Sequence, residues 1–209
     1  MKQFAASMFL LAGLVSVRAI AADEVTPEIR ADALKVAVTT CATCHGPQGV
    51  SISPKFPRLA GQSAAYISAQ MKNFKTHARG DADAIGYMWG MAAPVDDEVI
   101  AGLADYYSRQ KPAAGEIAAD SATRSRGKTL YAEGIAASGV PPCASCHGVN
   151  AAGTADFPRL AGQTTQYLIK QLRAFHNNMR DVAVMHGVTS GLSDGNMSDV
   201  AAYLASLGP

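Results

Sequence analysis

The chain contains four cysteines, and all four lie in two copies of one short motif. The copies read CATCH and CASCH, with the members Cys41, Cys44 and His45, then Cys143, Cys146 and His147. Two cysteines separated by two residues, with a histidine directly after the second, form the attachment signature of haem c. Both thiols can reach the edge of one porphyrin, and the histidine can reach its iron from the same side. The motifs predict two covalently attached haem c groups, with His45 and His147 as proximal iron ligands.

Other uses of paired cysteines fit the sequence less well. The two pairs of a zinc ribbon usually lie about 15–20 residues apart, whereas these pairs lie roughly 100 residues apart. A redox-active dithiol usually sits on a thioredoxin-like βαβ unit. Two structural disulfides are compatible with an oxidising compartment, but they leave the matched histidines without a role.

A longer repeat surrounds the two motifs. The sequence FPRLAGQ occurs at residues 56–62 and again at 157–163. The same spacing pairs three further residues of each half, namely Tyr66, Gln70 and Phe74 with Tyr167, Gln171 and Phe175. Because the landmarks keep one order, the chain is a tandem duplication. We predict a first domain over residues 22–114, a linker over 115–120 and a second domain over 121–209.

The first 21 residues predict export. A basic Lys2, an apolar stretch over about 4–17 and small residues at 19–21 form the layout of a cleaved secretory signal peptide. An uncleaved N-terminal anchor is the alternative. We therefore expect a periplasmic protein. Removing Lys2 and Arg18 leaves 16 basic against 17 acidic residues, a balance that argues against a nucleic-acid partner.

The hydrophobic pattern of each half is helical, which predicts an all-α fold. Ser63 and Thr164 are candidate N-caps, and Met88 and Met185 are expected in loops before the last helix of each half. The expected helices cover residues 27–40, 63–78, 96–111, 125–134, 164–179 and 193–207.

The repeat also selects candidates for the sixth iron ligand. At a spacing of 97 residues Met88 pairs with Met185, whereas Met91 pairs with a valine. Met88 and Met185 are therefore the predicted axial ligands, and Met91 is expected to pack as an ordinary core methionine. His186 remains an alternative ligand for the second iron.

These motifs together resemble the dihaem cytochrome c4 family across essentially the whole mature length. The resemblance implies two tandem cytochrome-c-like domains that face each other, each wrapped around one covalently bound haem c, with haem propionates near the interface. It also implies His/Met ligation of both irons. The expected protein is a periplasmic electron carrier, soluble or associated with a membrane, that feeds a terminal oxidase.

The resemblance gives the FPRLAGQ segments a role as well. The carbonyl of Pro57 is expected to accept a hydrogen bond from His45 Nδ1, and that of Pro158 from His147. Arg58 and Arg159 then become candidates to neutralise haem propionates, with a solvated loop position as the plain alternative. Tyr66 and Tyr167 are expected near the haem or the domain interface, or in the core.

The predicted activity is outer-sphere electron transfer between a respiratory donor complex and a terminal oxidase, without an enzymatic site. One alternative is the dihaem subunit of a larger oxidoreductase, such as a flavocytochrome c sulfide dehydrogenase. A second is an enzyme with an open iron position, such as a peroxidase or a thiosulfate-oxidising cytochrome. A third is a module that binds no haem.

Overall fold

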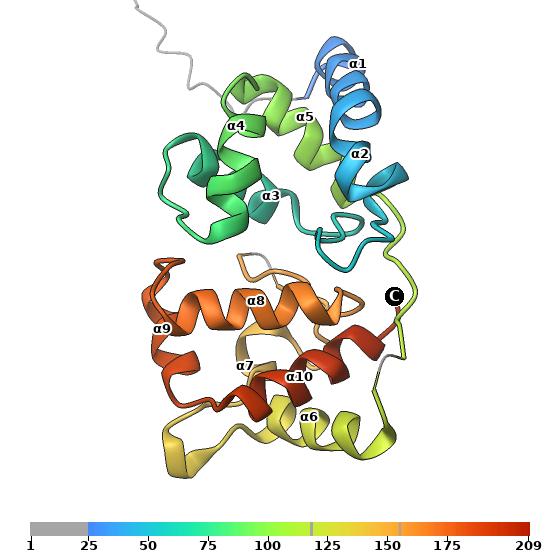
Figure 1. Cartoon of the computed structure of the whole chain (residues 1–209). Coiled ribbons are helices and arrows are strands. Elements are labelled where there is room, and N and C mark those ends of the chain that lie inside the picture. Colours follow the sequence, from blue (N-terminus) through green and yellow to red (C-terminus); the bar gives the residue numbers. More distant parts are fainter. Residues whose placement is uncertain (1–24, 118, 155) are drawn as a thin grey trace, which may run out of the picture.

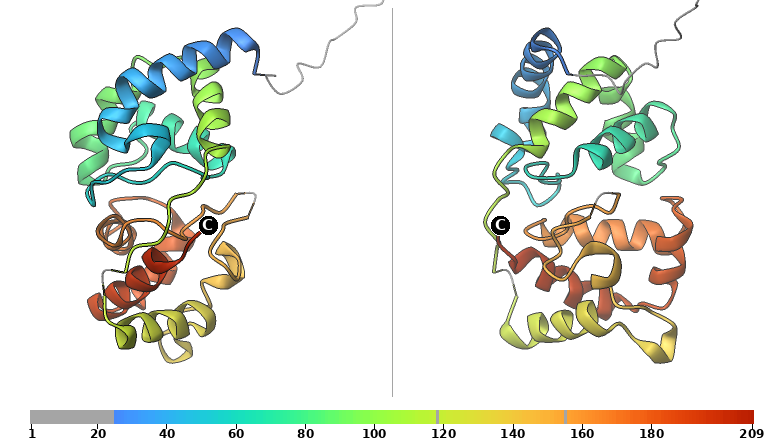
Figure 2. Two further views of the ribbon diagram at one scale, coloured as in Figure 1. Left: turned by 90° about the vertical axis from the view of Figure 1, so that its right-hand side faces the viewer. Right: turned by 180° about the vertical axis from the view of Figure 1, so that it is seen from behind.

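The computed structural model describes residues 25–117, 119–154 and 156–209. The predicted signal peptide over residues 1–21 lies outside the described residues. The described chain forms two helical lobes stacked end to end, and an extended segment on one side joins them (Figures 1 and 2). None of the helices in the described ranges is long and apolar enough to cross a membrane.

Each lobe contains one half of the sequence repeat. The first lobe consists of α1 (Pro27–Val36), η1 (Ala37–Cys41), α2 (Ala42–His45), η2 (Pro47–Gly49), α3 (Ala64–Lys75), η3 (Ala84–Met88), α4 (Trp89–Ala92) and α5 (Asp97–Ser108). The second lobe consists of α6 (Ser121–Glu133), η4 (Ala136–Ser138), α7 (Ala144–His147), α8 (Thr165–His176), α9 (Ala183–Ser190) and α10 (Asp194–Ser206). The all-α prediction is confirmed. Outside the helices, the described residues show only two isolated backbone bridges.

Helix α3 and its repeat partner α8 begin at the predicted caps. The hydroxyls of Ser63 and Thr164 each accept a hydrogen bond from the backbone N–H three residues ahead, at 3.1 and 3.4 Å. Both helices end three residues earlier than predicted. His77 and Asn178, which follow their ends, have φ values of 58° and 54°, a left-handed conformation that stops a helix.

The prediction that both methionines lie in loops is wrong. Met88 is the last residue of the π-helical turn η3 and leads into α4, and Met185 lies within α9. The residues around them, AIGYMWGMA and AVMHGVTS, contain no proline and several good helix formers. The glycines in these segments disfavour a helix, but each segment packs against its own lobe, and this packing outweighs their low helix propensity.

Each lobe has its own hydrophobic core, built where its first and last helices cross. α1 packs against α5, and α6 packs against α10. The crossing is close at a glycine in both lobes: an added Cβ would lie 2.6 Å from Ala33 Cβ at Gly102, and 2.0 Å from the carbonyl oxygen of Asp199 at Gly127. Residues of each CxxCH motif pack against the core of their lobe, namely Cys41 in the first and Cys143 and Ala144 in the second.

Candidate haem sites

The two motif histidines have the same environment in both lobes. His45 Nδ1 lies 2.8 Å from the carbonyl oxygen of Pro57, and His147 Nδ1 lies 3.0 Å from that of Pro158. Because a carbonyl only accepts, Nδ1 carries the proton and Nε2 is left as the donor atom for a metal. Burial lowers the pKa of both imidazoles, although the bond to the proline carbonyl opposes this effect. Each ring is thus held in one tautomer, with Nε2 free to bind a metal.

A phenylalanine packs edge-on against each of these rings. The centroid of Phe56 lies 6.3 Å from that of His45, and the centroid of Phe157 lies 5.9 Å from that of His147. Each phenylalanine is the first residue of FPRLAGQ. The repeated segment therefore orients the histidine twice, through its phenylalanine ring and through its proline carbonyl.

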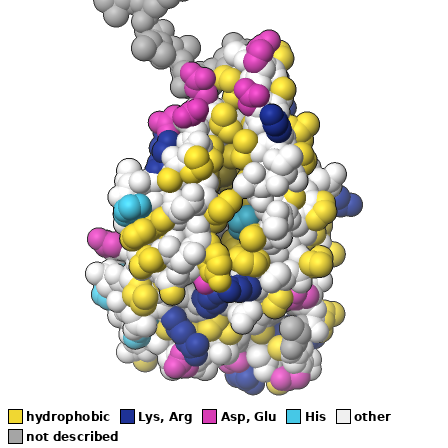
Figure 3. Space-filling view, turned by 45° about the horizontal axis from the view of Figure 1, so that its top comes forward, with side chains coloured by type: hydrophobic (Ala, Val, Ile, Leu, Met, Phe, Trp, Pro, Cys, Tyr) yellow, Lys and Arg dark blue, Asp and Glu magenta, His cyan; other side chains and the backbone are white. Residues whose placement is uncertain are grey.

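A cavity of about 670 Å³ reaches from one lobe into the other and is lined mainly by apolar side chains. Hydrophobic side chains gather around a hollow on the face shown in Figure 3. His45 and Met88 line the first part of the cavity, and His147 and Met185 line the second. Met91 also lines it but is 45% exposed, so the prediction that Met91 packs as a core residue is wrong. Each lobe thus places a histidine and a repeated methionine on one apolar cavity.

The cysteines lie within or next to the short turns α2 and α7, which carry the histidines. Cys41 and Cys44 line the cavity. Cys41 and Cys143 also pack against the hydrophobic cores of their own lobes.

The glutamines that end the two FPRLAGQ segments join the lobes through reciprocal hydrogen bonds. Gln62 accepts from the backbone N–H of Arg159 at 2.8 Å and donates to its carbonyl at 3.0 Å. Gln163 pairs in the same way with the backbone of Arg58, with both distances at 2.9 Å. Both glutamine side chains are buried. We call these four residues the glutamine clasp.

The side chains of Arg58 and Arg159 differ. The Arg58 guanidinium donates to the carbonyl of Gly162 at 2.6 Å and lies 3.5 Å from the carboxylate of Glu116. Arg159 donates to the carbonyl of Gly208, but its Nε atom is buried without a hydrogen-bond partner among the described residues. A buried N–H group without a partner, on the wall of an apolar cavity, fits the propionate carboxylates at the edge of a haem. The residues present therefore fit the group that the motifs imply.

A second cross-lobe network was missed from the sequence. Arg79 and Arg180 form an antiparallel bridge between the lobes, and both side chains are 5% exposed. Arg79 donates to Asp81 at 2.6 Å and to Gln171 at 2.8 Å. Arg180 donates to Gln70 and to Gln171, both at 2.8 Å. The two arginines lie 101 residues apart, the spacing of FPRLAGQ, so the repeat could have identified them.

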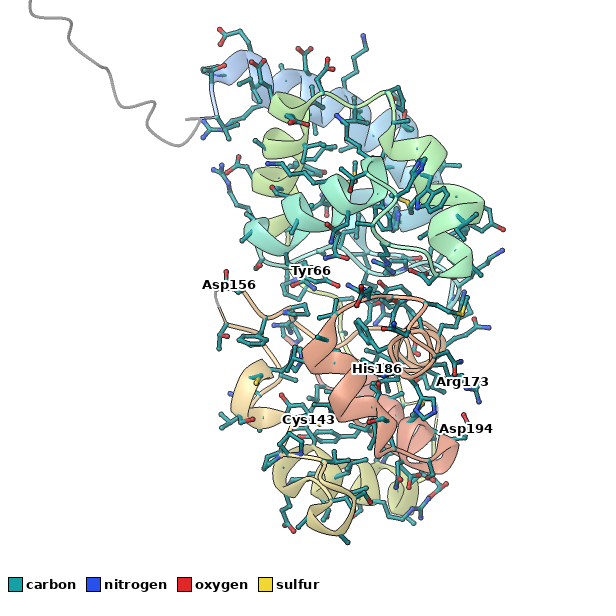
Figure 4. All side chains as sticks on the ribbon, turned by 90° about the vertical axis from the view of Figure 1, so that its left-hand side faces the viewer. Tyr66, Cys143, Asp156, Arg173, His186 and Asp194 are labelled. Atoms are coloured by element: carbon teal, nitrogen blue, oxygen red, sulfur yellow. The ribbon has the colours of Figure 1, made fainter. Side chains whose placement is uncertain are left out.

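Tyrosines complete this network from both sides. Arg180 donates to the hydroxyl of Tyr66 at 2.7 Å, and Arg79 lies 3.4 Å from that of Tyr167. Tyr66 lies where the two lobes meet (Figure 4). Both tyrosine hydroxyls accept a hydrogen bond from an arginine, so each can still donate its own proton to another acceptor. Both tyrosines also line the cavity, so the interface and the cofactor site share one wall.

Comparison with known proteins agrees with this architecture. The cytochrome c family model matches the chain twice, over residues 31–109 and 125–208. The chain is 37% identical over 203 residues to cytochrome c-552 of Acidithiobacillus ferridurans, covering 96% of this chain and 85% of that protein. It is 37% identical over 178 residues to cytochrome c4 of Azotobacter vinelandii, with coverages of 80% and 84%. It is also 33% identical over 172 residues to the thiosulfate dehydrogenase electron acceptor of Thiomonas intermedia, with coverages of 79% and 77%.

Solved structures give the same result. Cytochrome c4 of Acidithiobacillus ferrooxidans is 41% identical with a TM-score of 0.76, covering 80% of this chain and 98% of that one. Reduced cytochrome c4 of Pseudomonas stutzeri is 35% identical with a TM-score of 0.75, covering 86% and 98%. The predicted pair of tandem cytochrome c domains is confirmed, and so is the prediction of two covalently bound haem c groups. The chain therefore belongs to the dihaem cytochrome c4 family, whose members transfer electrons.

Proposed function

We propose that this dihaem cytochrome is a periplasmic electron carrier with His/Met ligation at both irons, and that it passes electrons from a respiratory donor complex to a terminal oxidase. The carrying observation is the placement of one Pro-oriented histidine and one repeated methionine on the same cavity in each lobe. The proposed ligand pairs are His45 with Met88 and His147 with Met185.

The chain's own residues suit electron transfer without bond rearrangement. When bound, haem iron supplies a one-electron couple, and a methionine sulfur ligand raises its potential relative to a second histidine. The proline carbonyls hold each histidine in one tautomer through either redox state. The apolar cavity wall limits water near the iron, which reduces the reorganisation that accompanies a change of charge.

The periplasmic location rests on the signal-like sequence over residues 1–21 and on family membership. Cleavage is testable by mass spectrometry of protein purified from the periplasmic fraction. A mature N-terminus at residue 22 supports the proposal, and an intact chain retained in membranes supports the uncleaved anchor.

The ligands are tested by optical redox titration of the mature protein, made with haem-maturation machinery. Ferric haem with a methionine sulfur ligand shows a weak far-red band. We expect both haems to be low-spin, to show this band and to titrate at positive potentials. Met88→Ala and Met185→Ala should each remove about half of the band. Met91→Ala is the matched control, because Met91 lines the same cavity but has no methionine counterpart in the repeat.

A high-spin haem in the unaltered protein would refute the carrier function for that lobe and favour an enzyme with an open iron position. Loss of the band in the Met91 variant would refute the assignment of Met88. If Met185→Ala keeps the band unchanged, His186 or another group is the second ligand.

A second candidate has support from two relatives described as thiosulfate dehydrogenase electron acceptors, which match 79% and 82% of this chain. In that role the protein accepts electrons from a sulfur-oxidising enzyme before passing them on. Stopped-flow mixing of the ferric protein with a purified thiosulfate dehydrogenase and thiosulfate distinguishes the two. Rapid reduction that depends on the thiosulfate dehydrogenase favours this second candidate function. Stable co-purification with a flavoprotein instead favours a subunit of a sulfide dehydrogenase.

A further inference from the structure

The interface between the lobes contains a buried cluster of three charged side chains. Apart from the two motif histidines, the fully buried charged side chains of the described residues are Arg79, Arg180 and Asp81. Two guanidiniums and one carboxylate give the chain's own side chains a net charge of +1, which would face the haem propionates expected at the interface. Buried charges are costly unless they are paired or hydrogen-bonded, and these three are. The next acidic residue along the chain, Asp83, is less buried and is already paired with Lys170 of the other lobe.

Asp81 breaks the two-fold symmetry of this cluster. The spacing of 101 residues that relates Arg79 to Arg180 relates Asp81 to Val182, which is half-buried and lines the cavity. Asp181, directly after Arg180, is exposed. The glutamine and tyrosine partners of the arginines are present in both lobes, so the carboxylate is the one charged group of the cluster that lacks a counterpart.

We propose that Arg79, Arg180 and Asp81 form a shared electrostatic element that tunes the reduction potentials of both haem centres, with Asp81 limiting the positive field. Both guanidiniums lie on the wall of the cavity that serves both lobes, and each bonds to side chains from the opposite lobe. One electron entering an iron lowers the positive charge there by one. Each guanidinium near the irons therefore favours the reduced state, and the carboxylate of Asp81 opposes it.

Asp81 stays charged at neutral pH. Burial alone would raise its pKa, but the attraction of Arg79 and Arg180 outweighs burial and holds the pKa below its usual value. The proposal concerns the field of the cluster and does not depend on which residues are the sixth ligands. A spectrum that keeps its low-spin form in each variant separates a failure of this proposal from a failure of the proposed ligation.

The test measures both midpoint potentials of the holoprotein in three variants. Asp81→Asn removes one negative charge at nearly constant shape and should raise both potentials. Arg180→Gln removes one positive charge and should lower both. Val182→Asp adds a carboxylate at the position equivalent to Asp81 without removing any arginine contact, and it should lower both. At an effective dielectric constant of about 20, a unit charge about 12 Å from an iron changes the equilibrium constant for its reduction about tenfold. This corresponds to a shift of about 59 mV in the midpoint potential.

The signs distinguish a field effect from a loosened interface. Looser packing admits water and moves the potentials of Asp81→Asn and Val182→Asp in the same direction, whereas the proposal requires opposite directions. Asp199→Asn, which breaks the surface pair with Arg126, is the matched control and should change either equilibrium constant less than twofold. If the midpoint potentials shift with the same sign in Asp81→Asn and Val182→Asp, or if only one haem shifts, the proposal is overturned.

Discussion

The glutamine clasp offers a direct measurement of what holds the two lobes together. In Gln163→Ala the backbone N–H and carbonyl of Arg58 each lose a buried partner in the other lobe, and the buried N–H of Thr164 loses its partner as well. Leaving a buried polar group unsatisfied costs about 1–3 kcal/mol. Three such groups, partly relieved by water at the interface, lead us to expect a loss of about 3–5 kcal/mol.

The assay is denaturation of the ferric holoprotein with guanidinium chloride. Far-UV circular dichroism follows the helices, and Soret absorbance follows the haem surroundings. Gln62→Ala removes the equivalent pair of bonds to Arg159 and should give a loss of similar size. Because the clasp joins the lobes, both variants should also separate the unfolding of the two lobes into distinct transitions.

Gln110→Ala is the matched control. Its amide donates to the carbonyl of Tyr106 in its own lobe, at a half-buried position near the chain connection. We expect it to cost less than about 1 kcal/mol, since it breaks a single local hydrogen bond. If Gln163→Ala costs no more than Gln110→Ala, and the lobes still unfold together, then packing or the bound haems hold the lobes and the clasp does not.

Three further predictions concern acid stability, helix packing and the segment of the first methionine. Because the folded pKa of Asp81 is depressed, its contribution is present above the unfolded value of about 3.9 and lost as pH falls through the folded value. Between pH 5 and 3 the free energy of unfolding, measured with urea, should therefore fall more steeply with decreasing pH in the native protein than in Asp81→Asn. The same pH dependence in both proteins would contradict this. Gly127→Ala should cost about 1–3 kcal/mol by thermal unfolding, since its Cβ overlaps a backbone carbonyl of α10. Gly195→Ala in α10, which has space, should be neutral or stabilising. Trp89→Phe removes the 2.8 Å bond from the indole N–H to the carbonyl of Arg79 and should weaken the far-red band without abolishing it, whereas an unchanged band would show that this bond does not position Met88.

The sequence alone determined the chemistry and the plan of the protein. Each CxxCH motif is local, so its three reactive residues are placed by one helical turn whatever the rest of the fold does. The duplication follows from identity at constant spacing, and the caps Ser63 and Thr164 follow from the residue types that satisfy a helix N-terminus. The proline after each motif was placed correctly beside its histidine only through resemblance to known cytochromes.

Only the tertiary structure decided how the two copies meet. Gln62 bonds to the backbone of a residue 97 positions away, and a hydrogen bond to backbone leaves no pattern of residue types in the sequence. Arg79 and Arg180 look like surface arginines in a polar loop, and they are buried because each lobe supplies the partners that the other lacks. Local patterns encode helices and covalent attachment, whereas contacts between the lobes depend on the mutual placement of residues far apart in the chain.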